Sequence, residues 1–315
     1  MLDSLQTAIN KDLRLALFFG LFLYTLGLVV LLPIAEIVMS GIYGLKFFEI
    51  LQILSGNFNV HAQGAQIFRV MQGINQIVTW GMGGLILTRL MGIFPQVLGV
   101  RRPMPPLMFF LPVVIIFLSV PLVQAIHISP EWAFWPESWR TGLEVWALQE
   151  KTSQESLMLI LGESTPRILV LNLFIFAFLP AVCEELFFRG FLQKRLSLAW
   201  KPSAAIGVAA IIFSFAHFQF LSFFSRLLLA GLLGYFFHTT QRLLPCIIAH
   251  FAYNSATILL IYFSSGAGNT LFGPIGEDIG MNGEIVLLSL ISTIILIQIF
   301  SRLYKPIDYP PPPYE

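Results

Sequence analysis

Charged residues are scarce in this chain. Only 11% of its 315 residues are Asp, Glu, Lys or Arg, against about 25% in a typical soluble domain. The formal net charge is +1, so the sequence lacks the strongly basic character of nucleic-acid-binding domains. We therefore predict no nucleic-acid partner, and no acidic substrate attracted by bulk charge.

Cysteine is equally rare. The two cysteines, Cys183 and Cys246, both fall in apolar segments, and they form neither a disulfide framework nor a paired spacing for zinc. Cys183 adjoins Glu184, which raises the alternative of a thiol nucleophile. A thiol in apolar surroundings is usually unreactive, so we do not assign it a catalytic role.

Apolar residues, in contrast, make up 57% of the chain, and the mean hydropathy is +0.80. Several apolar runs reach the roughly 20 residues that a membrane-spanning helix needs. The sequence therefore predicts an all-α, polytopic membrane bundle with about eight transmembrane helices. We expect them near residues 13–35, 67–94, 107–126, 168–198, 203–220, 222–238, 244–263 and 285–304.

We divide the chain into three regions: 1–165, 166–265 and 266–315. The first contains three spans and an extramembrane segment, residues 128–163, that is rich in tryptophan. Tryptophan favours the boundary between membrane and water, so an interfacial helix is predicted there, with a substrate-binding platform as the alternative. The second region is the predicted catalytic core, and the third holds a loop, the last span and a proline-rich tail.

Basic residues predict the orientation of the bundle. An even number of spans places both termini on one side, and most basic loop residues fall on that side: Lys11, Arg14, Arg101, Arg102, Lys194, Arg195, Lys201, Arg242, Arg302 and Lys305. Short cytoplasmic loops carry an excess of Lys and Arg. We therefore predict a multi-pass protein of the cell membrane with both termini in the cytoplasm.

The most informative stretch is residues 180–190, where two adjacent carboxylates lie in an apolar segment. Charged side chains are costly at membrane depth and usually face a partner or a water-filled cavity. Glu185 and Arg189 are four residues apart and would share one helix face, whereas Glu184 is turned away by about 100°. We predict that Glu185 and Arg189 form a structural pair and that Glu184 is free for chemistry.

Two further polar clusters lie in later apolar segments. Phe213 and His217 are four residues apart, as are His250 and Asn254, so each pair would share a helix face. Each polar residue could simply make a polar contact with a neighbouring helix. Three such clusters in separate membrane segments favour a functional site instead.

A helical hairpin would bring the first two clusters to one depth. Glu184 lies 16 residues before Trp200, and His217 lies 16 residues after Lys201. At 1.5 Å per residue, both would stand about 24 Å from the turn between these helices. A glutamate and a histidine at one depth suit the activation of a water molecule.

Amide hydrolysis needs a base for water and donors for the developing oxyanion. Glu184 can serve as the base, and His217 can hold the same water. His250 and the Asn254 amide can serve as the donors.

The three motifs, EExxxR, FxxxH and HxxxN, resemble those of the CPBP family of membrane-embedded CAAX-protease and bacteriocin-processing (Abi) proteins. The resemblance covers about residues 173–260. It implies an all-helical intramembrane endopeptidase with Glu184 as the base, His217 positioning water, and His250 and Asn254 stabilising the oxyanion. It also implies that Glu185 and Arg189 support the site.

The family is traditionally described as metalloproteases, and Glu184, His217 and His250 could hold zinc as readily as water. We predict metal-free chemistry with no cofactor, and keep zinc as the alternative.

The leading prediction is an endopeptidase that cuts a membrane-associated or lipidated protein or peptide. One alternative is a non-proteolytic membrane scaffold or immunity protein with the same fold. A transporter with a proton relay is a third, although the chain lacks the internal repeats common in such folds.

The tail, residues 309–315, favours polyproline II and matches a PPxY ligand pattern. Such short patterns arise easily, so a solvated terminus is the simpler interpretation, and a WW-type partner is the alternative.

Overall fold

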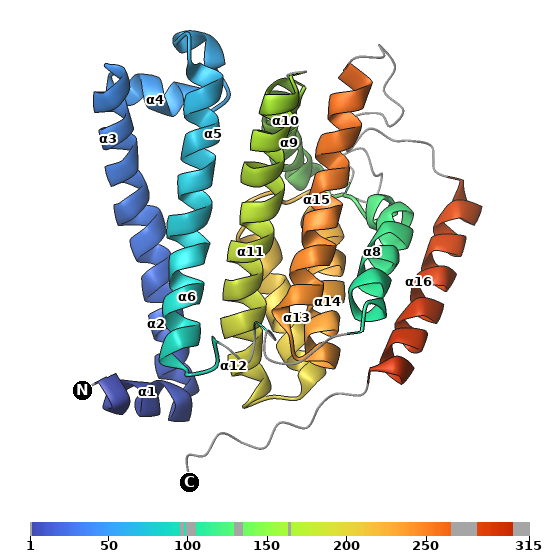
Figure 1. Cartoon of the computed structure of the whole chain (residues 1–315). Coiled ribbons are helices and arrows are strands. Elements are labelled where there is room, and N and C mark those ends of the chain that lie inside the picture. The colour runs from blue at the N-terminus through green and yellow to red at the C-terminus, as the bar shows by residue number, and fades with distance from the viewer. Residues whose placement is uncertain are drawn as a thin grey trace.

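The computed structural model describes residues 2–94, 98, 105–128, 135–162, 165–265 and 282–304, whose regular structure is entirely helical. Figure 1 shows an upright bundle of helices, with the short helix α1 lying across its lower end. The predicted all-α fold is confirmed. The proline-rich tail and most of the loop predicted before the last span lie outside the described residues.

The first half of the chain folds into two long helical segments joined by a short helix. The bounds are α1 Leu2–Lys11, α2 Leu13–Thr25, η1 Leu26–Leu31, α3 Leu32–Tyr43, α4 Phe47–Leu54, η2 Phe58–Val60, α5 Gly64–Asn75, η3 Gln76–Gly81 and α6 Met82–Leu90. The segments η1 and η3 are π-helical turns inside otherwise continuous helices.

The second half is built around one continuous helix, residues 166–197, that stands at the centre of the bundle (Figure 1). Its parts are α10 Pro166–Asn172, η4 Leu173–Phe178, α11 Leu179–Glu185, η5 Leu186–Gln193 and α12 Lys194–Ser197. The other helices are α8 Leu107–Ala125, α9 Glu137–Leu161, α13 Pro202–Phe215, α14 Phe223–Thr240, α15 Leu243–Ser265 and α16 Gly283–Leu303.

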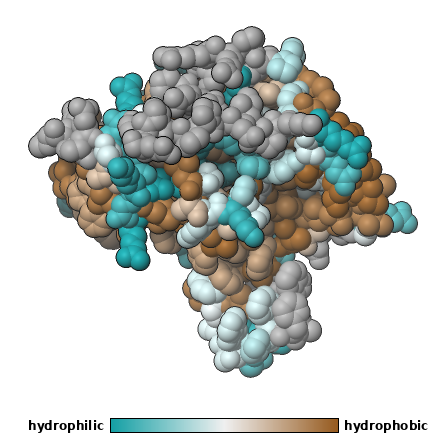
Figure 2. All heavy atoms as spheres, turned by 90° about the horizontal axis from the view of Figure 1, so that it is seen from below, coloured by the Kyte–Doolittle hydropathy of each residue, from teal (hydrophilic) through white to brown (hydrophobic). Residues whose placement is uncertain are grey.

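Five helices of the described residues are long and apolar enough to cross a membrane: 13–43, 107–125, 166–197, 243–263 and 283–303. Large apolar side chains such as Phe18, Val170 and Leu288 are more than 60% exposed, which suits a lipid environment. Viewed from the α1 end, apolar side chains cover the flanks of the bundle (Figure 2). The chain is a membrane protein, but the predicted count of eight spans is not confirmed.

The helix predicted over residues 203–220 is shorter than expected. It ends at Phe215, and the chain then turns through Ala216, His217 and Phe218. Phe218 adopts a left-handed conformation with φ of 52°, which stops the helix without a glycine. His217 therefore lies in a turn at the helix end and not within a membrane helix.

The first half packs closely against the central helix. A Cβ atom added to Gly84 of α6 would lie 2.8 Å from the backbone nitrogen of Phe187 in η5, so only glycine allows this approach. Trp80 of η3 is buried beside the rings of Phe187 and Phe188, with ring centroids 5.4 and 5.0 Å away. These contacts bring polar residues of η3 next to the carboxylates of α11.

Helix α1, the turn between α12 and α13, and the end of α16 lie at the same end of the bundle, whereas α4 lies at the other (Figure 1). Of the basic residues, Lys194 and Arg195 belong to α12, and Lys201 lies in the turn that follows it. Which membrane side this end faces stays a prediction, as does the division into three regions.

Candidate active site

The adjacent carboxylates are buried at the end of α11, where Glu184 is 4% exposed and Glu185 is fully buried. The π-helical segment η5 begins with the next residue. Such widened turns are often found at functional sites, because they reorient side chains that an α-helix would hold in register. The two acids precede this segment on α11, and the turn of about 100° between neighbouring residues of a helix directs them toward different partners.

Glu185 and Arg189 form the ion pair that their spacing predicts, with 2.8 Å between Arg189 Nη1 and Glu185 Oε1. Arg189 Nη2 also donates to the backbone oxygen of Ala230 in α14, at 3.0 Å. The guanidinium lies over the ring of Phe213, 5.0 Å from its centroid. Arg189 therefore ties the central helix to α13 and α14.

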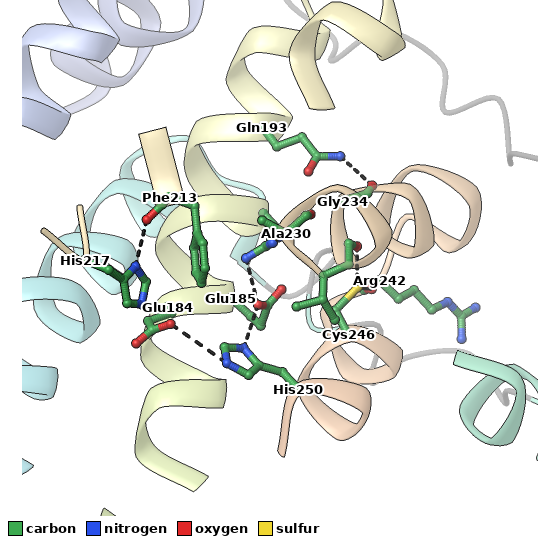
Figure 3. A network of polar contacts seen from close by, with 12 residues as sticks. Glu184, Glu185, Gln193, Phe213, His217, Ala230, Gly234, Arg242, Cys246 and His250 are labelled. Atoms are coloured by element: carbon green, nitrogen blue, oxygen red, sulfur yellow. Dashed lines mark hydrogen bonds and ion pairs between the residues drawn. The ribbon is translucent and has the colours of Figure 1, made fainter. Parts of the chain in front are cut away.

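His250 of α15 lies between the two carboxylates (Figure 3). Its Nδ1 is 3.0 Å from Glu185 Oε1, and its Nε2 is 3.9 Å from Glu184 Oε2. Because a carboxylate accepts hydrogen bonds, Nδ1 carries the proton of the first contact, which leaves Nε2 directed at Glu184. Glu185 thus orients His250 as well as Arg189, which the spacing argument did not foresee.

His217 approaches the same cluster from the end of α13. Its Nδ1 is 2.8 Å from the backbone oxygen of Phe213, an acceptor, so Nδ1 carries a proton and Nε2 is the free nitrogen of a neutral ring. The rings of His217 and Phe213 are 4.6 Å apart. In the view of Figure 3, the Glu184 carboxylate lies between the rings of His217 and His250.

Asn254 follows His250 by one helical turn on α15 and is partly buried. Among the predicted site residues, direct contacts join Glu184, Glu185, Arg189 and His250. The roles assigned to these residues stay predictions.

Gln76 contributes from the first half of the chain. Its side chain lies close enough to the Glu184 carboxylate to interact with it, and its Oε1 is buried without a hydrogen-bond partner within the described residues. Its amide nitrogen is the group that can donate to the carboxylate. The sequence shows Gln76 as one of several polar residues at the start of a span, but no pattern links it to Glu184.

Two other residues near the site escaped sequence reasoning. Glu150 of α9 accepts hydrogen bonds from the Leu221 backbone nitrogen and the Ser222 hydroxyl, both at 2.7 Å, and so holds the loop that follows His217. Arg226 of α14 interacts electrostatically with both His217 and Glu184. The sequence feature that could have pointed to Arg226 is an arginine in an otherwise apolar helix.

The described residues contain no group of three or more His, Cys, Asp or Glu side chains arranged to hold a metal ion. His250 Nδ1 contacts Glu185, which leaves His250 Nε2, Glu184 and His217 Nε2 as the candidate ligands. A carboxylate on the second ring nitrogen is common in histidines that bind metal, so the choice between water and zinc stays a prediction.

Comparison with known proteins supports the motif argument. No curated protein and no solved structure matches the chain. Residues 166–256 match the model of a family described as type II CAAX prenyl endopeptidase Rce1-like. This segment is less than a third of the chain, but it carries all three motifs. Over these residues the chain is similar to CAAX-type membrane proteases, which confirms the family resemblance predicted from the motifs.

Proposed function

We propose that the protein is an intramembrane endopeptidase that hydrolyses a peptide bond of a membrane-associated substrate carrying a lipid group, such as a prenyl chain. One observation carries this proposal. The buried carboxylate of Glu184 faces His250 Nε2 across 3.9 Å, within a segment similar to prenyl endopeptidases. This distance is too long for a hydrogen bond, but one water molecule with contacts of about 2.8 Å can join the two groups.

In the proposed reaction, Glu184 takes a proton from this water, and the hydroxide oxygen attacks the carbonyl carbon of the scissile bond. His250, as an imidazolium with a hydrogen on each ring nitrogen, donates through Nε2 to the oxyanion that forms, and the Asn254 amide donates to it as well. The carbon–nitrogen bond then breaks, and the proton held by Glu184 passes to the leaving amine. The reaction consumes one water and needs no other reactant.

Neighbouring residues position the reacting groups. His217, with Nδ1 fixed by the Phe213 carbonyl, offers Nε2 as an acceptor for the second proton of the water. Gln76 holds the Glu184 carboxylate by its amide. Glu185 and Arg189 fix the ring of His250 and the separation of the helices. We propose no cofactor for this chemistry.

The test is cleavage of a fluorogenic, farnesylated peptide by the purified protein in detergent. Glu184→Gln should lower kcat by about 10³-fold, within the range for a lost general base, while the melting temperature stays unchanged. Glu36→Gln is the matched control, because Glu36 is a buried carboxylate of the membrane helix α3 and should leave kcat unchanged. Full activity of Glu184→Gln would contradict the proposal.

The same assay addresses the non-proteolytic alternative. A wild-type protein that binds the farnesylated peptide but never cleaves it would favour a scaffold or immunity protein. Cleavage of soluble and farnesylated peptides with equal kcat/KM would instead show that the substrate does not need a lipid group.

We further propose that the α12–α13 end of the bundle faces the cytoplasm, because its loops are basic. In a variant without Cys183 and Cys246, Lys201→Cys should react with a membrane-impermeant thiol reagent in inside-out vesicles. Lys46→Cys, exposed at the opposite end, should react in right-side-out vesicles. The reverse labelling would invert the orientation.

A further inference from the structure

Arg226 lies in the first turn of α14, next to the loop that follows His217. Its Nη2 donates to Gln219 Oε1. Its Nη1 is buried and has no hydrogen-bond partner within the described part of the chain. A guanidinium has five N–H donors in a fixed planar fork, so part of this fork is left for another acceptor.

The charges around Arg226 do not neutralise it by direct contact. Its guanidinium interacts electrostatically with Glu150 and Glu184, but no carboxylate of the described residues lies within ion-pair distance. Both oxygens of Glu150 already accept hydrogen bonds from the Leu221–Ser222 segment. Glu150 is thus held in place and attracts Arg226 only from a distance.

The contrast with Arg189 is informative. Arg189 contacts a carboxylate, a backbone oxygen and an aromatic ring, so both terminal nitrogens and one face of its guanidinium have partners. Arg226 as a residue is half-buried, but its Nη1 is buried without a hydrogen-bond partner in the described residues, and an unpaired buried donor costs free energy. Arg226 also lies close enough to the candidate site to interact with both Glu184 and His217.

We propose that Arg226 binds a carboxylate of the peptide substrate through the free part of its guanidinium fork. The carboxylate is either the C-terminal group or an acidic side chain near the scissile bond, since both present the same planar pair of oxygens. Binding there places the peptide beside Glu184 and fixes which bond is cut. This inference rests on the proposed peptidase function, because it assigns specificity to the same site.

Binding tests the inference separately from cleavage. In the Glu184→Gln background, which prevents turnover, three fluorescent farnesylated peptides are titrated into the purified protein. The first two share one sequence without acidic side chains and end in a free carboxylate and in an amide, respectively. The third is the amide peptide with an aspartate placed before its end. The first peptide should bind about 10- to 100-fold more tightly than the plain amide, the range for a hydrogen-bonded charge. Tight binding of the third peptide as well would show that an acidic side chain serves equally.

Arg226→Gln should abolish this preference by weakening only the carboxylate peptides to the affinity of the plain amide. Arg226→Lys, which keeps the charge but loses the fork, should retain part of it and covers the case that Arg226→Gln fails to fold. Arg302→Gln is the control, because Arg302 is an exposed arginine of α16. It should leave all three affinities unchanged.

Equal affinity of the unmodified Glu184→Gln protein for all three peptides, or no binding of any, would overturn the inference. An unchanged preference in Arg226→Gln would do the same. A carboxylate preference that depends on Arg226, in a protein that never cleaves the peptides, would support the inference and reject the peptidase function. Conversely, cleavage that depends on Glu184 but is equally fast for all three peptides would reject only the inference.

The kinetic readout separates specificity from a catalytic role. With Glu184 intact, Arg226→Gln should raise KM for the carboxylate peptide and leave kcat for the amide peptide unchanged. An equal fall of kcat for both peptides, without a change in binding, would make Arg226 an oxyanion donor instead and overturn its assignment to the substrate carboxylate.

Discussion

Two buried polar clusters involve the same central helix, and their hydrogen bonding differs. We call the one around Asn172 the upper cluster and the one around Glu184 the lower cluster, after their places in Figure 1. In the upper cluster, Arg69 of α5 donates to the Asn172 side chain and to the backbone oxygen of Ile160, both at 2.9 Å. Asn172 donates to the same backbone oxygen at 3.2 Å. All acceptors of Arg69 in these contacts are neutral, and no atom of Arg69 or Asn172 is among the unsatisfied buried atoms of the described residues.

The lower cluster, around Glu184, leaves polar atoms without partners. Glu185 Oε2, Gln76 Oε1 and Arg226 Nη1 are all buried and lack a hydrogen bond within the described residues. The cluster also combines two carboxylates with an imidazole, groups that exchange protons. The upper cluster ties α5, α9 and α10 together, whereas the lower one has capacity left for water and substrate. Buried polar side chains alone do not indicate a functional site. Buried titratable side chains with unsatisfied hydrogen-bonding atoms are the stronger indication.

The largest stability effect should follow from breaking the ion pair that joins the lower cluster to the fold. Arg189→Ala leaves Glu185 buried without its cation, and we expect a loss of about 3–5 kcal/mol in the free energy of unfolding. Unfolding in mixed detergent micelles measures it. The exposed arginine Arg302, replaced by alanine, provides the comparison and should change stability little. Equal stability of both variants would mean that the 2.8 Å pair contributes nothing.

A smaller stability effect is expected in the upper cluster. Asn172→Ala removes the acceptor of Arg69 Nε and leaves that donor unsatisfied, which should cost about 1–3 kcal/mol. The kcat of the protein that remains folded should not change, because the cluster has no part in the proposed chemistry. A fall in kcat at full stability would show that the upper cluster also shapes the site.

Gln76 should affect activity more than stability. Gln76→Leu removes the amide that holds the Glu184 carboxylate, and we expect kcat to fall about 10-fold, equivalent to about 1.4 kcal/mol, the lower end for a hydrogen bond to a charged group. Gln72→Leu, one turn earlier on α5, is the control and should retain the wild-type kcat. Similar losses in both variants would point to general damage to the span.

Local spacing in the sequence predicted much of this arrangement. The ion pair of Glu185 with Arg189 and the contact of Phe213 with His217 join residues four apart, so helical geometry alone brings them together. The hairpin between α12 and α13 forms where Trp200 and Lys201 interrupt the apolar run. Each of these features depends on residues that are close in the chain.

The features that sequence reasoning missed depend on contacts between distant segments. Gln76 reaches Glu184 because glycines allow α6 to lie directly on η5, and no periodic pattern encodes that approach. Glu150 lies in the tryptophan-rich segment 128–163, for which the sequence predicted only an interfacial helix, yet it holds the loop that follows His217. The early end of α13 depends on the left-handed backbone of Phe218, a residue type that rarely adopts it. Tertiary packing decided each of these cases.

The smallest effect is expected from removing metal, because the reaction proposed for the lower cluster uses a water molecule and no ion. His250 Nδ1 contacts Glu185, and Nε2 lies 3.9 Å from Glu184 Oε2, so the proposed reaction uses this gap for water. Dialysis of the purified protein against a strong chelator should therefore leave kcat and the melting temperature unchanged. Loss of activity that zinc alone restores would assign Glu184, His217 and His250 as ligands, and a fall in melting temperature on chelation would show that the ion also holds α11 and α15 together.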